Sequence, residues 1–127
     1  MSCHVARRRV EVERRLRRER REVSHALETT DVELAGFAGT RPVELVDAAA
    51  TEATCRLLAR LEDRDHRMLA EIEAAERRLA TGAFGVCEGC AAPIGAARLR
   101  VVPTARLCIA CEAMAESCEI GQERRGA

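Results

Sequence analysis

Residues 82–111 read GAFGVCEGCAAPIGAARLRVVPTARLCIAC and contain two C-x2-C pairs, which are the strongest indication of structure in the chain. Cys87 and Cys90 form the first pair, and Cys108 and Cys111 form the second after seventeen intervening residues. Each pair can direct two sulfurs toward one ion, so together they supply the four thiolates of a tetrahedral zinc site. Four thiolates leave no coordination position for an activated water, so we expect one structural, non-catalytic Zn²⁺.

Two other uses of these cysteines stay open, namely a disulfide set and a redox or iron site. Disulfides need an oxidising compartment, and the N-terminal residues MSCHVARRR lack the apolar segment of a secretory signal. We therefore favour zinc, which would stabilise a segment too short and glycine-rich to fold alone. Gly85 and Gly89 are expected to permit the tight backbone turns of the first pair.

The remaining cysteines are interpreted as structural. Cys118 lies seven residues after Cys111, on nearly the same helical face, and is expected to pack as a small apolar side chain. Cys55 has the same interpretation within a helix, and Cys3 is placed in a frayed terminus. The alternative for Cys3 is a metal site shared with His4.

Upstream of the cysteines, glycine and proline divide the chain into two long segments. Residues 1–35 contain neither, Gly36, Gly39 and Pro42 cluster, and the next is Gly82. Two such segments around a short gap predict two helices joined as an antiparallel hairpin. Apolar positions three and four apart predict a coiled-coil seam. Its members are Val12, Leu16, Glu19, Val23, Ala26 and Thr30 in the first segment, and Leu58, Leu61, Asp65, Met68, Ile72, Ala75 and Leu79 in the second.

The predicted protein is mainly α. We expect an antiparallel two-helix coiled-coil hairpin over residues 1–81, with its tip at about 36–47. A small C4 zinc finger with a short C-terminal helix follows over 82–120. That helix is expected to end near Gly121, and residues 121–127 are expected to form a flexible tail.

Composition excludes several classes of function. The 127 residues have zero formal net charge and two aromatic residues, Phe37 and Phe84, so a base-stacking platform is excluded. Residues 1–30 hold nine Arg against five Glu, and the Arg-rich run at 7–21 is interpreted as a solvated helix face, with docking on an acidic partner as the alternative. We find no phosphate-binding glycine loop, no Ser/His/Asp arrangement and no membrane-length apolar run. A cytoplasmic protein that is not an enzyme, with no small-molecule substrate and no membrane partner, is expected.

The sequence around the cysteines resembles that of a known family. The run FGVCEGC at residues 84–90, Ile94-Gly95, Arg98-Leu99 and the run PTARLCIAC at 103–111, after a helical hairpin, are similar to the DksA/TraR family of bacterial RNA polymerase regulators. The resemblance covers roughly residues 40–120. It implies a hairpin that enters the polymerase secondary channel and places acidic residues of its tip near the catalytic magnesium.

The family tip pattern is D-x-x-D-x-A, and the matching stretch is residues 44–49, ELVDAA. Asp47 and Ala49 match, whereas Glu44 keeps the charge but is one methylene longer. From the residues alone, Asp47 precedes a run of good helix formers and is predicted to be the N-cap of the second helix. Both roles are compatible, because a capping carboxylate on a rigid helix is held in position.

The resemblance also bears on the alarmone ppGpp. Family members that bind it use basic side chains at positions that correspond here to Glu71, Val102 and Glu112. Two carboxylates and a valine would meet a polyphosphate unfavourably, and Arg64 and Arg98 do not restore the set. We therefore expect no ppGpp site of this type.

The leading hypothesis is a non-enzymatic transcription regulator that binds RNA polymerase and changes the stability of promoter complexes. The alternative is a zinc-stapled coiled-coil adaptor that binds another protein through its Arg-rich first helix. Direct sequence-specific DNA binding is not expected, because Arg98, Arg100 and Arg106 form no basic helix face in the finger. A redox sensor that releases zinc on oxidation is a further alternative.

Overall fold

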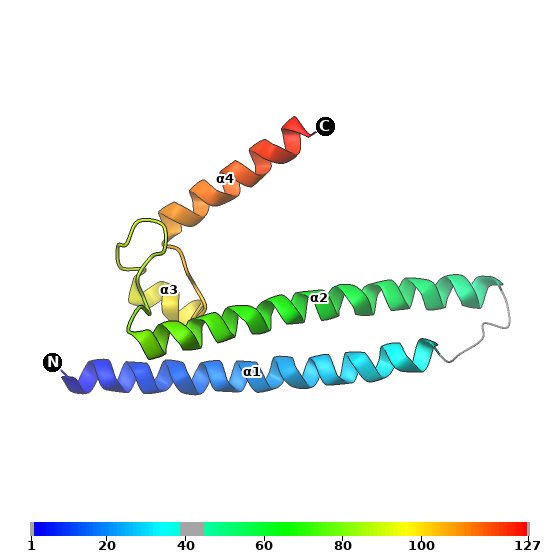
Figure 1. The fold of residues 1–127 in the computed structure, drawn as a ribbon, viewed down its shortest axis with the longest axis horizontal. Helices are drawn as coiled ribbons and strands as arrows, with labels where there is room; N and C mark the ends of the chain where they lie inside the picture. Colours follow the sequence, from blue (N-terminus) through cyan, green and yellow to red (C-terminus); the bar gives the residue numbers. More distant parts are fainter. Residues whose placement is uncertain (1, 39–44, 127) are drawn as a thin grey trace. The chain divides into compact units, whose positions relative to one another are not determined.

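The computed structural model describes the backbone of residues 2–38 and 45–126 and the side chains of 7–36, 49–122 and 126. It contains the helices α1 (Ser2–Ala38), α2 (Leu45–Thr81), α3 (Ala96–Val101) and α4 (Ile109–Arg125), as Figure 1 shows. Over the described ranges the only strand-like pairing is a single antiparallel bridge between Val86 and Pro93. The predicted mainly α fold with a helical hairpin is confirmed. Among the described residues, no helix is both long and apolar enough to cross a membrane.

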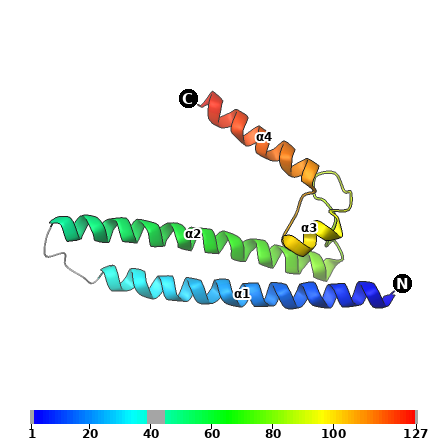
Figure 2. The ribbon, with the colours of Figure 1, turned by 180° about the vertical axis from the view of Figure 1, so that it is seen from behind.

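The chain divides into two compact units, and the first to consider is residues 14–73, which we call the hairpin arm. It pairs α1 with α2 in antiparallel fashion, and the two helices lie side by side in both views (Figure 2). Its core is a single row of side chains, because two helices can cover each other on one face only. The buried members are Leu16, Val23, Leu27, Thr30 and Ile72.

The predicted seam is confirmed in part of the arm. Leu16, Val23 and Ile72 are buried as expected, but Leu61 and Met68 remain 38% and 42% exposed. A two-helix ribbon shields a seam residue from one side, so long side chains in it keep contact with water. Leu27, outside the predicted set, is buried because a 3.6-residue period drifts from a strict heptad.

Residues 1–13 and 74–127 form the second unit, which we call the zinc-finger unit. Here α2 buries Ala75 and Leu79 before ending at Thr81. The end is defined by Gly82, whose φ of 78° is left-handed, and by the hydrogen bond from the Ala83 N–H to the Arg78 carbonyl at 3.0 Å. This is a Schellman cap, which satisfies a free carbonyl and turns the chain into the cysteine-rich segment.

Two predicted helix boundaries differ from the structure. Helix α4 continues through Gly121 to Arg125, because one helical glycine costs only about 1 kcal/mol relative to alanine. Helix α2 begins at Leu45, so Asp47 lies in its first turn and the prediction of an N-cap there was wrong. Glu44 lies outside the described residues. The predicted division of the chain after residue 81 stays a prediction.

Candidate metal centre

The four paired cysteines meet at one point. The sulfurs of Cys87, Cys90, Cys108 and Cys111 all lie within 4.8 Å of one another, and those of Cys90 and Cys108 are 3.8 Å apart. Zinc with Zn–S distances near 2.3 Å has tetrahedral edges of about 3.8 Å. The cluster therefore fits Zn²⁺, which would fix two distant segments of chain to one centre.

The first knuckle, residues 87–90, is a tight hairpin. The Cys87 N–H donates to the Ala92 carbonyl at 2.8 Å, and the Ala91 N–H donates back to the Cys87 carbonyl at 2.9 Å. Gly85 adopts a φ of 82°, as expected of a glycine that permits a turn. Ala91 also has a positive φ, 59°, which an alanine adopts only at a cost in free energy. These backbone hydrogen bonds hold the turn that brings both sulfurs of the pair to the same side.

Gly89 serves the site differently from the prediction. Its φ is not among the positive values, so the turn does not need a glycine at this position for backbone conformation. A Cβ added at Gly89 would lie 3.0 Å from the Cys111 sulfur and 3.3 Å from the Cys111 Cβ. Glycine allows the two knuckles to pack this closely, since a methyl group at this position would make the Cys111 side chain shift.

The second knuckle, residues 108–111, opens helix α4. Cys108 is the N-cap, and its sulfur accepts a hydrogen bond from the Cys111 N–H at 3.5 Å. The sulfur of Cys87 accepts hydrogen bonds from the Cys108 N–H at 3.2 Å and the Gly89 N–H at 3.4 Å. Backbone N–H groups and a helix N-terminus both stabilise negative charge on sulfur. The cluster is therefore built for thiolates rather than thiols.

Hydrogen bonds shift the pKa values of two of the cysteines in opposite directions. The hydrogen bond from the Cys108 backbone is the main cause that lowers the pKa of Cys87 to about 6. Hydrogen bonding to the Cys108 sulfur is the main cause that raises the pKa of Cys111 to about 12. Four thiolates this close repel one another, so full deprotonation needs a compensating positive charge. A divalent cation supplies that charge.

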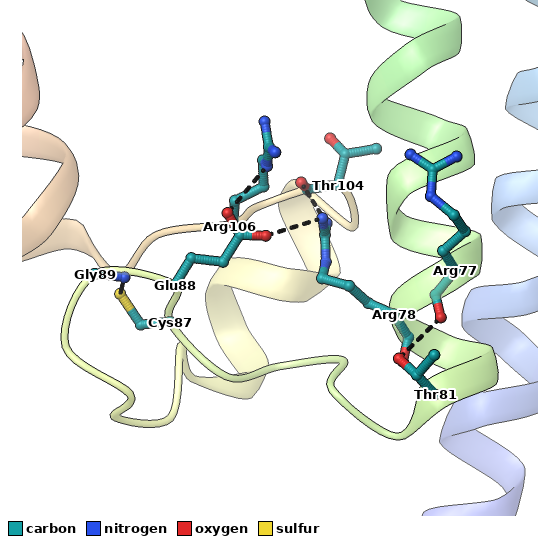
Figure 3. Close-up of polar contacts among 8 residues, drawn as sticks. All are labelled: Arg77, Arg78, Thr81, Cys87, Glu88, Gly89, Thr104 and Arg106. Atoms are coloured by element: carbon teal, nitrogen blue, oxygen red, sulfur yellow. Dashed lines mark hydrogen bonds and ion pairs between the residues drawn. The ribbon is translucent and has the colours of Figure 1, made fainter.

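Glu88 joins the first knuckle to its surroundings (Figure 3). Its carboxylate lies between Arg78 of α2 at 3.6 Å and Arg106 at 3.3 Å. Arg78 also donates to the Thr104 carbonyl at 3.1 Å, and the Glu88 N–H donates to the Arg106 carbonyl at 2.9 Å. The last turns of α2 are thus tied to both sides of the metal centre. The sequence did not point to Arg78 and Glu88, because no motif or regular spacing links an arginine and a glutamate in separate segments of the chain.

A small apolar core and a second arginine complete the centre. Cys87, Ile94 and Ala105 are buried, with Leu99 and Leu107 packed against them. Arg98 of α3 donates to the Leu107 carbonyl at 3.2 Å and pairs with Glu112 of α4. Two arginines of the finger, Arg98 and Arg106, are thus engaged by carboxylates rather than presented to a partner.

The other residues singled out in the sequence lie apart from this centre. Cys118 is exposed, so the expectation that it packs as an apolar side chain was wrong, and Cys55 is half-buried on α2. Ala49 is exposed on α2. The side chains of Asp47 and Cys3 lie outside the described residues.

Comparison with known proteins agrees with this geometry. Residues 82–116 match the family described as prokaryotic dksA/traR C4-type zinc finger, a range that includes all four clustered cysteines. The structure is similar to that of transcription factor DksA2 from Pseudomonas aeruginosa, with a TM-score of 0.76 and 33% identity. The match covers 87% of this chain and 84% of that one. Among curated proteins, none matches this sequence. The protein belongs to the DksA/TraR family, with the helical hairpin and C4 zinc finger of a DksA-type factor.

Proposed function

We propose that this protein is a non-enzymatic transcription regulator that acts by binding RNA polymerase. The observation that supports the proposal is the likeness to a transcription factor across both the hairpin and the zinc finger, at 33% identity over 84% of that factor's chain. A likeness confined to the finger would support only a shared metal site. Binding would alter transcription by favouring one polymerase state over another, which requires different affinities for the two states.

The zinc finger has a supporting role in this proposal. Cys87, Cys90, Cys108 and Cys111 bind one structural Zn²⁺, since their sulfurs fill a tetrahedral coordination sphere. The ion joins α4 and the first knuckle, and Glu88 ties the knuckle to Arg78 at the end of α2. The metal thereby holds the two knuckles together beside the last turns of α2 and takes no part in chemistry.

The hairpin tip is the proposed point of action. Glu44, Asp47 and Ala49 are proposed to face the polymerase inside its secondary channel, on the resemblance of their spacing to the family pattern. The start of α2 at Leu45 supports a fixed placement of Asp47, because a first-turn residue follows its helix. The helix N-terminus also favours a carboxylate there.

The proposed regulator acts without ppGpp at the family site. Glu71 and Val102 stand where basic side chains would be needed. Glu112 pairs with Arg98, so its carboxylate also neutralises a nearby arginine that would otherwise attract a phosphate.

Co-purification of the tagged protein with RNA polymerase tests the proposal. The tip variant Glu44→Gln/Asp47→Asn removes two charges with little change of shape. The matched control Glu28→Gln/Asp63→Asn removes two exposed carboxylates from the hairpin arm. Zinc is quantified in the same preparations, and a promoter-complex lifetime assay follows.

We expect polymerase to be recovered with wild type and control, and the effect on promoter complexes to be lost in the tip variant. Zinc at one equivalent per chain without polymerase would overturn the proposal and favour the adaptor. A tip variant as active as wild type would remove the tip from the mechanism.

A further inference from the structure

One face of α1 in the hairpin arm is occupied by arginines. Arg14, Arg17, Arg18 and Arg21 have the spacing i, i+3, i+4 and i+7, which places them together on a helix. All four are exposed, whereas Leu16, Val23 and Leu27 of the same helix are buried. We call these four residues the arginine stripe. It spans about 10 Å along the helix at 1.5 Å per residue.

The four guanidinium groups of the stripe have no partner in the part of the chain that is described. Other arginines of the same run are paired, Arg15 with Glu19 at 2.8 Å and Arg20 with Glu73 at 3.5 Å. Glu22 lies at the edge of the stripe, four residues after Arg18, and forms no ion pair with it. The arginines beside the stripe are thus paired with glutamates, whereas the four of the stripe are not.

This row is unfavourable for the isolated helix. Arg14 with Arg18 and Arg17 with Arg21 are like charges four residues apart, and such pairs destabilise a helix. A merely solvated face would alternate its signs, as α2 does with Arg56 and Glu52 at 2.7 Å. Water and counterions screen this repulsion, and a bound anionic partner would offset it directly.

The surroundings of the stripe distinguish between two kinds of anionic partner. A protein interface has an apolar centre with large anchoring side chains. The exposed large apolar side chains of α1 are Val10, one turn before the stripe, and Val32, about three turns after it, and none lies between them, so they form no apolar centre. A nucleic-acid backbone needs no such anchor, because phosphate contacts from arginine and the release of counterions supply the binding free energy. The planar guanidinium group also matches phosphate in a bidentate geometry.

We propose that the arginine stripe binds the phosphate backbone of a nucleic acid without reading its sequence. The contact is separate from the zinc finger, whose Arg98 and Arg106 are engaged by carboxylates. It is also separate from the hairpin tip and does not depend on the proposed role in polymerase binding. Without aromatic side chains on the stripe, the contact is with phosphates rather than with stacked bases.

Fluorescence anisotropy of the full-length, zinc-loaded protein with a labelled duplex of about 20 base pairs, titrated over a range of salt concentrations, tests the proposal. The stripe variant Arg14→Gln/Arg18→Gln/Arg21→Gln removes three charges. The matched control Arg56→Gln/Arg60→Gln/Arg67→Gln removes three exposed arginines from α2 in the same arm. Circular dichroism establishes that both variants keep their helices.

Four phosphate contacts predict a slope of log K against log salt of about −3.6, which falls to about −1 in the stripe variant. The control is expected to bind as wild type does. Absence of binding at low salt, or equal binding by stripe and control variants, would overturn the proposal. Loss of polymerase by the stripe variant, with no duplex binding by wild type, would instead assign the stripe to a protein surface.

Discussion

The contact between α2 and the first knuckle makes Arg78 the most informative residue to change. Arg78→Met removes the guanidinium group and keeps most of the hydrocarbon stem. The side chain of Arg78 is only 11% exposed, and it donates to the Thr104 carbonyl and faces Glu88. Removing the guanidinium group leaves the partly buried Thr104 carbonyl without its charged hydrogen-bond donor. Such a bond contributes about 1.5–3 kcal/mol.

Glu88, the ion-pair partner of Arg78, allows the two expected losses of stability to be compared. Glu88 is 46% exposed, so each of its ion pairs contributes no more than about 1 kcal/mol. We therefore expect Arg78→Met to lower the free energy of unfolding by about 2–3 kcal/mol and Glu88→Gln by about 1 kcal/mol. The double variant should lose less than the sum, by the coupling of the Arg78–Glu88 pair.

Urea unfolding of the zinc-loaded protein, followed by far-ultraviolet circular dichroism, measures these differences. Arg77→Met is the control, because Arg77 is the neighbouring exposed arginine on α2 and its side chain forms no ion pair among the described residues. Its effect should stay within about 0.5 kcal/mol. An Arg78→Met variant as stable as this control, or additive losses in the double variant, would refute the reasoning.

Three further outcomes are expected around the metal centre. Ala91→Gly should raise the free energy of unfolding by about 0.5–1 kcal/mol, because the φ of 59° strains an alanine. Gly95→Ala should lower it by a similar amount, because the φ of 96° would strain an alanine although there is open space around it. Urea unfolding checks both, and a change of stability in the same direction for the two variants would contradict the backbone argument. Gly89→Ala should weaken zinc binding in a chelator competition, because its Cβ would lie 3.0 Å from the Cys111 sulfur, whereas Gly121→Ala, in open space, should not. Removing zinc should abolish hydrogen-exchange protection in the two knuckles and leave most of it in the hairpin arm, whose core contains no cysteine of the cluster. Equal loss of protection in both would show that the arm depends on the metal.

The metal centre and the two long helices could be predicted from local patterns. Two C-x2-C pairs specify a four-sulfur site because each pair is a short-range unit that presents two sulfurs together. The cluster of Gly36, Gly39 and Pro42 indicated a break between the helices, because glycine has a low helix propensity and proline lacks the backbone N–H, although Gly36 itself lies within α1. Helix ends were less predictable, since α4 passes through Gly121 and α2 begins before Asp47.

The four metal-binding candidates, the helical hairpin and the family could all be predicted from the sequence, because each is a property of a short motif or of periodicity. The position of Glu88 between Arg78 and Arg106, and the close packing of Gly89 against Cys111, could be seen only in the folded protein. The physical reason is distance along the chain. Arg78 and Arg106 are far apart in sequence, and their meeting at one carboxylate depends on how the knuckles fold back on α2.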